Sequence, residues 1–453
     1  MANVYLKIEI KQRELISRIL IAMHCAIKKN TVYLGNLQDY LFKDKLCPGL
    51  FMDKSISRTA SKISKLKKIR ENGHIITSMD EEMGVSHENY HSFAKLRFSN
   101  ETLKLTSAIF CWGDFDFKFL KKKYKKYKKI FFKTGSPRVD ICNILKKFDQ
   151  RKRLNKLPKK KYIVVASNFG TIVSKKPLWK VLSDRKHYYK KKKVDNNVEN
   201  ESFRFGRDIW KTLILREYLD FIEKLSLSFK NKFILIRPHP SEVKKSWEAI
   251  LNKNLKNVGV MNDYSSSEVL NFAELMIHSG CTTGLEAKLL GTPVISFNPL
   301  KDRTYERKFF TKCGKEINNS EKIISFIKKN NYRKISKNQS FEKELDYKFF
   351  MNKSISSSAR ISDVIQSLIR SKNLNNYKNS FRNWYTLNIV EIKFFIKKIF
   401  FMNSKEKYYQ HKFSDIAAYE VEEMIKILKK TNKNFSNIKF KIFGDRLLKI
   451  WSD

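Results

Sequence analysis

Two polar segments of this chain carry side chains that bind phosphate or move protons, and each follows an apolar run. The first is Arg237–Pro240, of sequence RPHP, after the run Phe233–Ile236. The second is Ser279–Gly284, of sequence SGCTTG, where the run Leu275–Ile277 gives way to a helical pattern. Backbone N–H groups and hydroxyls at the start of a helix attract an anion. Ligands of open α/β sheets bind beyond the carboxyl ends of the strands, so the two segments predict one phosphate-bearing ligand held from two sides.

Arg237 and His239 are the expected contacts of a leaving phosphate. A histidine can donate a hydrogen bond or a proton to a phosphate as negative charge grows in the transition state. The prolines on both sides of His239 fix the backbone and with it the direction of the imidazole. The alternative is a strand end with a structural histidine. The threonine turn that follows in the sequence favours the functional interpretation.

The turn and the helix after it can bind a phosphate in a second way. Thr282 and Thr283 can equally cap the helix, because capping and phosphate binding use the same geometry. Gly280 and Gly284 allow close backbone approach. Glu286 could accept hydrogen bonds from ribose hydroxyls or only compensate the helix dipole, and both interpretations stay open. The expected donor-binding residues are Arg237, His239, Ser279, Gly280, Thr282, Thr283, Gly284 and Glu286.

Three neighbouring carboxylates, Asp80, Glu81 and Glu82, follow a strand-like segment that ends at Ser78. Crowded like charges raise one another's pKa, and a raised pKa suits a general base that deprotonates an acceptor hydroxyl. The alternative is a solvated acidic turn, which would be unusual in so basic a chain. The expected catalytic residues are therefore these three carboxylates together with His239.

The segment Asp114–Asp116, of sequence DFD, has the form of a metal-binding DxD motif. It precedes a helical pattern, so Asp114 is better explained as an N-cap, and no metal or other cofactor is expected. Three further residues are expected to line the same cleft as the phosphate site. They are Arg138, Asn168 and Gly170.

Strand and helix patterns alternate twice along the chain, which predicts an α/β fold with parallel sheets and crossover helices. A basic, polar run at 147–161 separates the two series. We therefore expect two Rossmann-like domains facing a cleft, over 1–150 on the acceptor side and 160–345 on the nucleotide side. Residues 346–453 are expected to form a basic, mostly helical extension. Segment 174–207 is polar and poorly periodic, and is expected to be a surface loop.

The chain of 453 residues carries 93 basic and 45 acidic side chains, a formal net charge of +48. Lysine dominates the basic set and is spread along the whole chain, so a nucleic-acid-binding protein is disfavoured but kept as an alternative. The six cysteines have no metal-site or disulfide spacing, which fits a reducing compartment. There is no signal-peptide pattern and no run of about 18 apolar residues, so the expectation is a cytoplasmic protein.

The stretch Val390–Phe401 mixes aromatic residues with lysines. Its apolar residues cover much of a helix circumference, which favours a helix that packs back onto the domains. The alternative is an interfacial helix on an anionic membrane. That alternative would make the protein peripheral on the inner face of the cytoplasmic membrane.

From Lys7 to about Pro299 the chain resembles bacterial surface-carbohydrate biosynthesis proteins of the two-Rossmann-domain (GT-B) glycosyltransferase fold. More remotely, His239-Pro240 with Thr282-Thr283 is similar to the His-Pro and paired-hydroxyl motifs of bacterial sialyltransferases, Kdo transferases and glycerophosphotransferases. Their acidic base motif is matched loosely, since Met83 separates Glu82 from the next glycine. The segments that carry the resemblance are Glu9–Glu14, Asp80–Glu82, Thr134–Arg138, Asn168–Gly170 and His278–Ala287.

The resemblance implies an enzyme that transfers a sugar from a nucleotide-activated, CMP-linked donor to a hydroxyl of a glycan or lipid-linked acceptor, without a metal. It also leaves two other activities open on the same fold. One is a nucleotide-sugar 2-epimerase, and the other is a CDP-polyol phosphotransferase. The sugar, the acceptor and the choice among the three carboxylates are not fixed by the sequence.

Overall fold

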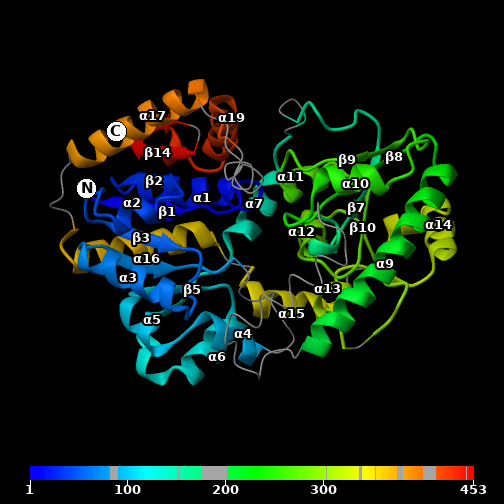
Figure 1. The fold of residues 1–453 in the computed structure, drawn as a ribbon, viewed down its shortest axis with the longest axis horizontal. Coiled ribbons are helices and arrows are strands. Elements are labelled where there is room, and N and C mark those ends of the chain that lie inside the picture. The colour runs from blue at the N-terminus through cyan, green and yellow to red at the C-terminus, as the bar shows by residue number, and fades with distance from the viewer. Residues whose placement is uncertain are drawn as a thin grey trace. The chain divides into compact units, whose positions relative to one another are not determined.

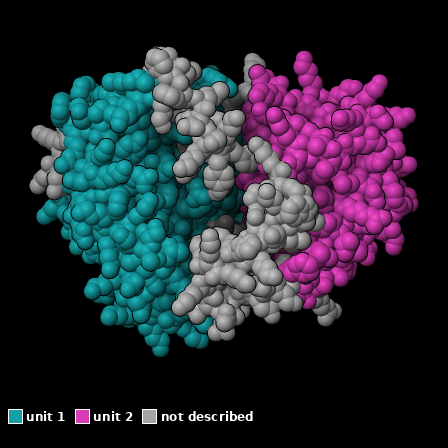
Figure 2. Space-filling view, viewed as in Figure 1, with its two compact units in different colours: residues 1–148, 339–453 teal, residues 149–338 magenta. Residues whose placement is uncertain are grey.

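The computed structural model describes residues 1–81, 90–149, 151, 154–174, 201–302, 304–335, 339–351, 354–374, 381–400, 415–444 and 446–453. The chain forms two compact units, coloured separately in Figure 2. Unit 1 consists of residues 1–148 and 339–453, and unit 2 of residues 149–338. The chain therefore leaves unit 1, builds unit 2 as one continuous segment and returns to unit 1.

Unit 1 contains an eight-stranded sheet in the order β13-β14-β2-β1-β3-β4-β5-β6. The strands from β2 to β6 are parallel, and the hairpin β13–β14 joins the edge of β2 antiparallel. The strands are β1 (Asn3–Lys7), β2 (Thr31–Gly35), β3 (Leu50–Asp53), β4 (Ile75–Ser78), β5 (Ala108–Cys111), β6 (Phe131–Lys133), β13 (Ile438–Phe443) and β14 (Leu447–Ser452).

Helices α1 to α6 of unit 1 connect its parallel strands, and helices cover the sheet (Figure 1). Helix α1 has apolar residues at helical spacing, and its Leu15, Ile19 and Met23 are buried, where it packs on α16 and α7. The helices are α1 (Lys11–Ala26), α2 (Gln38–Phe42), α3 (Ala60–Glu71), α4 (Tyr90–Arg97), α5 (Asn100–Leu105), α6 (Asp114–Lys123), α7 (Pro137–Leu145), α15 (Gln339–Phe349), α16 (Ser357–Ser371), α17 (Phe381–Phe400) and α19 (Ala418–Lys429).

The last hundred residues differ from the separate helical extension expected over 346–453. They belong to unit 1 and end in two strands of its sheet. The half-buried carboxylate of Asp140 in α7 accepts the backbone N–H groups of Ser357 (3.0 Å) and Ser358 (2.8 Å). Arg360 donates to the carbonyl of Thr134 (2.7 Å). These long-range bonds at the start of α16 attach the returning chain to α7, and local sequence periodicity does not reveal them.

Unit 2 contains a six-stranded, entirely parallel sheet in the order β12-β11-β10-β7-β8-β9. Counted from the first strand of the unit, this is the order 6-5-4-1-2-3 of the doubly wound dinucleotide-binding fold, with its switch point between β7 and β10. The strands are β7 (Tyr162–Ala166), β8 (Phe233–Arg237), β9 (Val258–Val260), β10 (Leu275–His278), β11 (Val294–Phe297) and β12 (Lys315–Ile317).

The core of unit 2 lies between this sheet and its helices, with Tyr218, Phe221 and Trp247 buried against the central strands. The helices are α9 (Glu201–Ser228), α10 (Lys244–Ile250), α11 (Ser266–Leu270), α12 (Thr282–Leu290), α13 (Lys308–Thr311) and α14 (Ser320–Lys328). Short 3-10 turns add Lys125–Ile130 and Lys433–Phe435 in unit 1, and Gly170–Ile172 and Asn331–Lys334 in unit 2.

The predicted α/β class with parallel sheets is confirmed in both units. Most of the expected loop at 174–207 lies outside the described residues, and its end, from Glu201, is already the start of α9. Within the described part of the chain, no helix combines the length and the apolar character needed to cross a bilayer.

Candidate functional site

The strands that precede the candidate phosphate-binding segments of unit 2 end at the same position along the sheet. Arg237, the last residue of β8, pairs in register with Ala166 of β7, and Ala166 pairs with His278 of β10. Neighbouring strands lie about 4.8 Å apart, so the ends of β8 and β10 are separated by about 10 Å with β7 between them. The segments after β7, β8 and β10 therefore share the carboxyl edge of the sheet at its switch point, where ligands of such sheets bind.

Glu242, in the turn after His239, organises the loops that follow β7 and β8. Its carboxylate is buried, and this residue was not expected from the sequence. Burial raises the pKa of Glu242, and the donated hydrogen bonds oppose that rise. The carboxylate accepts from the Ser167 hydroxyl, the backbone N–H groups of Phe169 (2.7 Å), Gly170 (3.0 Å) and His239 (3.2 Å), and the Trp247 indole N–H (2.7 Å).

His239 is exposed, and its backbone and ring are both held. The backbone N–H donates to the Ser167 hydroxyl (3.1 Å) as well as to Glu242. The ring Nδ1 accepts the backbone N–H of Ser241 (3.2 Å) and lies 2.7 Å from the Ser241 hydroxyl. An accepting Nδ1 assigns the proton of the neutral ring to Nε2. The imidazole can therefore offer an N–H donor beyond the strand end, as a leaving phosphate requires.

Arg237 is buried and bonded to protein groups, whereas a direct phosphate contact would need an accessible guanidinium. Its guanidinium donates to the carbonyl of Met261, after β9 (3.3 Å). Burial lowers the pKa of Arg237 to about 10, and the carboxylates of Glu286 and Asp263 oppose the shift. Glu286 of α12 therefore interacts electrostatically with Arg237 at the end of β8. This interaction gives Glu286 a partner within the protein, which neither sequence interpretation of that residue included.

Helix α12 begins at Thr282, which is one residue too early for a threonine to be its N-cap. Gly280 takes a left-handed conformation (φ +63°), and Cys281 is the N-cap without a side-chain cap hydrogen bond. Thr282 and Thr283 are therefore the first two residues of the helix, and the expectation that they cap it is wrong. Both are half-buried. The backbone N–H of Gly284 donates to the Cys281 carbonyl (3.1 Å), whereas the N–H of Thr282 lies where a helix has no acceptor of its own and where an anion can bind.

His278 supports this turn from inside the unit. Its Nδ1 accepts the backbone N–H of Cys281 (3.0 Å), and its Nε2 lies 3.2 Å from the hydroxyl of Ser296. Burial lowers the pKa of His278 to about 3, so the ring is neutral. A Cβ on Gly284 would come within 2.5 Å of the ring, so this glycine permits α12 to pack on His278. Gly284 thus has a packing role, and a ligand is not needed to explain it.

The remaining candidates of unit 2 lie in the same loops. Ser279 is half-buried and opposes the rise that burial causes in the pKa of Tyr218, whose hydroxyl donates to the carbonyl of Phe297 (3.1 Å). The Asn168 carbonyl accepts from Lys211 of α9 (2.8 Å). Gly170 has φ +62°, and its backbone N–H is one of the donors to Glu242. A Cβ on Gly170 would lie 3.8 Å from the Ser241 hydroxyl, which places the loop after β7 beside the loop that holds His239.

The acidic segment belongs to unit 1, and two of its carboxylates face arginines. Glu81 forms an ion pair with Arg18 (2.9 Å), and both side chains are almost fully buried. Asp80 pairs with Arg97 (3.3 Å). Mutual repulsion between carboxylates was the expected cause of a raised pKa, whereas these two have positive partners. Glu82 lies outside the described residues.

The DFD segment has a structural place in α6. Gly113 is the N-cap, so Asp114 is the first helical residue, and the expectation that it caps the helix is wrong. Asp116 instead reaches back to accept the N–H groups of Trp112 (2.8 Å) and Gly113 (2.9 Å). Burial raises the pKa of Asp116 to about 7. Arg138 is half-buried in the first turn of α7 in unit 1. Among the described residues there is no group of three or more side chains suited to hold a metal ion.

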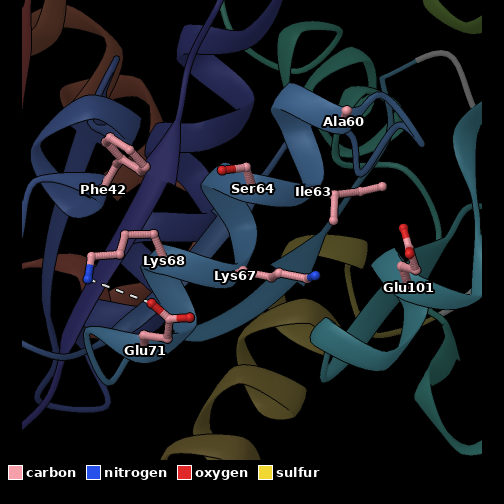
Figure 3. A pocket seen from close by; sticks show the side chains of 8 residues that line it. All are labelled: Phe42, Ala60, Ile63, Ser64, Lys67, Lys68, Glu71 and Glu101. Atoms are coloured by element: carbon pink, nitrogen blue, oxygen red, sulfur yellow. Dashed lines mark ion pairs between the residues drawn. The ribbon is translucent and has the colours of Figure 1, made fainter.

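Two surface pockets lie outside these loops. One, of about 600 Å³, lies in unit 1 between α2, α3 and α5. Figure 3 shows Ile63 and Lys67 of α3 on its Glu101 side and the Lys68–Glu71 ion pair (3.6 Å) toward Phe42. The other, of about 490 Å³, runs beside β9 in unit 2 and is lined by several lysines. Neither lining includes a residue of the candidate site.

Comparison with known proteins finds similarity only among solved structures. No protein-family model and no curated protein sequence matches the chain. UDP-GlcNAc 2-epimerase from Methanocaldococcus jannaschii is 14% identical over 81% of this chain and 99% of its own, with a TM-score of 0.45. The wall teichoic acid polymerase TagF is 11% identical over 82% of this chain and 89% of its own, with a TM-score of 0.48.

Proposed function

We propose that the protein is a glycosyltransferase of cell-surface polysaccharide biosynthesis that uses a nucleotide-activated, CMP-linked sugar. Unit 2 binds the nucleotide at the carboxyl edge of its sheet. The acceptor is a hydroxyl of a glycan or a lipid-linked glycan at the inner face of the cytoplasmic membrane. The observation that carries the proposal is His239, held by Glu242, Ser167 and Ser241 beside the switch point of the sheet.

The reaction is a displacement at the anomeric carbon of the sugar. The bond from this carbon to the phosphate oxygen breaks, and CMP leaves with the electron pair. His239 donates a hydrogen bond from Nε2 to the phosphate as its charge grows, and the first turn of α12 adds N–H donors and the helix dipole. We propose that this stabilisation replaces a metal ion. Arg237 acts by positioning, because its guanidinium is buried and donates to the carbonyl of Met261.

A carboxylate of Asp80, Glu81 or Glu82 takes the proton of the acceptor hydroxyl in this proposal. Glu81 is held by a buried arginine and Asp80 by a second arginine. The three amide variants therefore separate the roles. The base is the residue whose amide variant abolishes transfer while nucleotide affinity and folding stay near those of the unchanged protein. Loss of a general base typically costs about a hundredfold to ten-thousandfold in rate.

The nucleotide is tested by calorimetry with CMP, CDP, UDP and GDP, each with and without a divalent metal. We expect CMP to bind without metal. His239→Ala is expected to weaken CMP binding and to slow transfer further, because the contact strengthens in the transition state. His91→Ala is a matched control, since His91 is an exposed histidine of unit 1. UDP binding that strictly requires a divalent ion, or no cytidine nucleotide binding, would reject the donor assignment.

A polyol-phosphate transferase is the second candidate, because the same His239 and helix N-terminus would bind a CDP-linked donor. The two candidates differ in the bond that breaks. Sugar transfer from a CMP donor breaks a carbon–oxygen bond and releases CMP with the phosphate. Polyol phosphate transfer breaks a phosphorus–oxygen bond of CDP-polyol and also releases CMP, but leaves phosphate in the product. Phosphorus analysis of the product therefore distinguishes them.

A further inference from the structure

Helix α17 presents an unusual row of large apolar side chains to solvent. Phe381 is 74% exposed, Trp384 59%, Tyr385 53%, Ile392 58% and Ile396 51%. Their spacing places them along one side of the helix. The ring centroids of Phe381 and Trp384 lie 5.5 Å apart, and those of Phe381 and Tyr385 lie 6.0 Å apart. We call these five residues the α17 apolar face.

The opposite side of α17 is fixed to unit 1, so the exposure is not that of a loose helix. Asn383 accepts the backbone N–H of Cys47 (2.7 Å) and donates to the hydroxyl of Tyr5 (3.0 Å). The Thr386 hydroxyl donates to the carbonyl of Lys45 (2.6 Å), and Leu387 is buried. A helix held by polar contacts on its inner side keeps the α17 apolar face directed outward.

Basic residues accompany this face. Helical spacing places Arg382 and Lys393 beside this face, and the acidic residue Glu391 lies in the same helix. Next to it, the hairpin strand β13 carries Lys439 and Lys441, whose side chains are 57% and 52% exposed. The Nζ of Lys441 lies 4.0 Å from a carboxylate oxygen of Glu391 in α17, so this lysine of β13 lies next to the helix. In Figure 1, α17 (orange) runs alongside the strands at this side of unit 1.

We propose that α17 docks unit 1 on an anionic lipid bilayer, with the helix lying in the interface and the α17 apolar face inserted among the headgroups. Tryptophan and tyrosine combine an apolar ring with a polar tip and favour this depth, and lysines beside them attract anionic headgroups. Pairing with a second copy is disfavoured, because two chains of charge +48 repel each other. This inference does not depend on the proposed glycosyl transfer.

The test is sedimentation of the full-length protein with vesicles of phosphatidylcholine alone or mixed equally with phosphatidylglycerol, at physiological salt. Wild-type protein is expected to bind the anionic vesicles. The triple variant Phe381→Ser, Trp384→Ser and Tyr385→Ser should lose about tenfold or more in affinity, because three exposed rings no longer enter the interface. The replaced side chains are exposed, so the thermal unfolding temperature should stay unchanged.

A matched control replaces three exposed apolar residues of unit 2. Leu213, Leu227 and Ile250 are 47%, 60% and 42% exposed, and serine at these positions should leave vesicle binding unchanged. In a single variant, Trp384→Phe should keep the binding and remove part of the fluorescence quenching by bromine-labelled lipids. That readout reports on insertion and is independent of stability.

A charge control follows the same design. Lys439→Glu with Lys441→Glu should weaken binding to anionic vesicles more than Lys68→Glu with Lys118→Glu. All four lysines are exposed and each has one acidic partner. The proposal is overturned if wild-type protein ignores anionic vesicles, or if the aromatic triple variant binds them as wild-type does. It is also overturned if that variant loses binding to single-stranded oligonucleotide and keeps vesicle binding, which would assign the face to nucleic acid.

Discussion

Glu242 is a single buried carboxylate on which two loops of the candidate site depend. Glu242→Gln replaces one accepting oxygen by an amide that faces the donors of Ser167, His239 and Trp247. Hydrogen bonds to a charged group contribute about 1.5–3 kcal/mol each, so the loop should rearrange. We expect CMP affinity to fall in calorimetry, and His239→Ala to add little in the Glu242→Gln background, because both changes remove the same oriented donor.

The control for this prediction is Glu248→Gln in the adjacent helix α10. Glu248 is about half exposed and makes only a 3.8 Å pair with Lys244, so CMP affinity and stability should be unchanged. Full additivity of the Glu242 and His239 effects on CMP affinity would show that the two residues act separately. In that case Glu242 would not be a positioning residue for the histidine.

Glu81 is expected to affect folding before it affects chemistry. Glu81→Gln leaves the charge of Arg18 buried without its carboxylate, which typically costs about 3–5 kcal/mol. Asp80→Asn should cost less, since its partner Arg97 keeps 23% of its side chain exposed. Denaturant unfolding measures both variants. An unchanged unfolding free energy for Glu81→Gln, together with lost transfer, would instead identify Glu81 as the base.

His278 predicts a pH dependence of folding. Its folded-state pKa, about 3, lies below the ordinary histidine value of 6.5 because the ring is buried. The unfolded chain therefore binds the proton more readily than the folded chain between these values. The stability that neutral His278 contributes is present above about pH 6.5 and is lost as pH falls toward 3. His278→Asn should lower stability near pH 7 and flatten this acid limb in thermal melts. His24 and His74, whose pKa values burial also lowers, to about 4, remain as further contributors.

At the scale of elements, strands at the centre of the unit 2 sheet were predictable. Phe233–Ile236 and Leu275–Ile277 are continuous apolar runs with clear ends, and they form most of β8 and β10. Strands β3, β9 and β12 are short and have little periodicity, so the sequence did not indicate them. Their partners are set by the sheet, and such long-range pairing is not visible in a local pattern.

The hairpin β13–β14 was missed for a different reason. Lysines alternate with Ile438, Phe440 and Ile442, and this segment falls within the mostly helical region expected over 346–453. The left-handed Gly444 (φ +60°) marks the turn between the strands. Period-two alternation around a glycine is the signal that could have identified the hairpin.

The candidate site was predictable as far as strand ends allow. Arg237, His239 and the turn before α12 follow apolar runs, and the sheet order brings their strand ends to one edge. The role of Glu242 was not predictable, because its carboxylate bonds residues more than seventy positions earlier in the chain. The ion pair between Arg18 and Glu81 was not predictable either, because the two residues are far apart in the sequence.

The packing of α12 on β10 gives a prediction for this element. In Gly284→Ala the new Cβ would meet the His278 ring at 2.5 Å, so ring or helix must shift. Overpacking of this kind typically costs about 1–3 kcal/mol in unfolding free energy. CMP affinity should fall as well, since the first turn of α12 moves. Gly73→Ala is the control at a glycine away from the site. Its backbone has φ +83°, which strains a residue with a Cβ, so stability should fall while CMP affinity stays unchanged.

At the scale of the whole molecule, the path of the chain separates two kinds of dependence. Unit 2 is one continuous segment, and its six strands pair only with one another. The fold of unit 1 depends on both ends of the chain. Helix α16 hydrogen-bonds Asp140, α17 hydrogen-bonds Tyr5, and β14 pairs with β2. Cutting the chain near residues 148 and 338 should therefore leave unit 2 able to fold and prevent the folding of unit 1.

We expect a fragment of residues 149–338 to fold cooperatively and to bind CMP, since Arg237, His239, Glu242 and the turn before α12 all lie within it. A fragment of residues 1–148 should not fold alone, because the returning helices and strands would no longer cover its sheet and apolar surface would be exposed. Circular dichroism melts and calorimetry measure both. If 149–338 folds but binds CMP far more weakly than the full chain, unit 1 contributes to nucleotide binding. If it folds and binds equally well with His239→Ala, the nucleotide site lies elsewhere in unit 2.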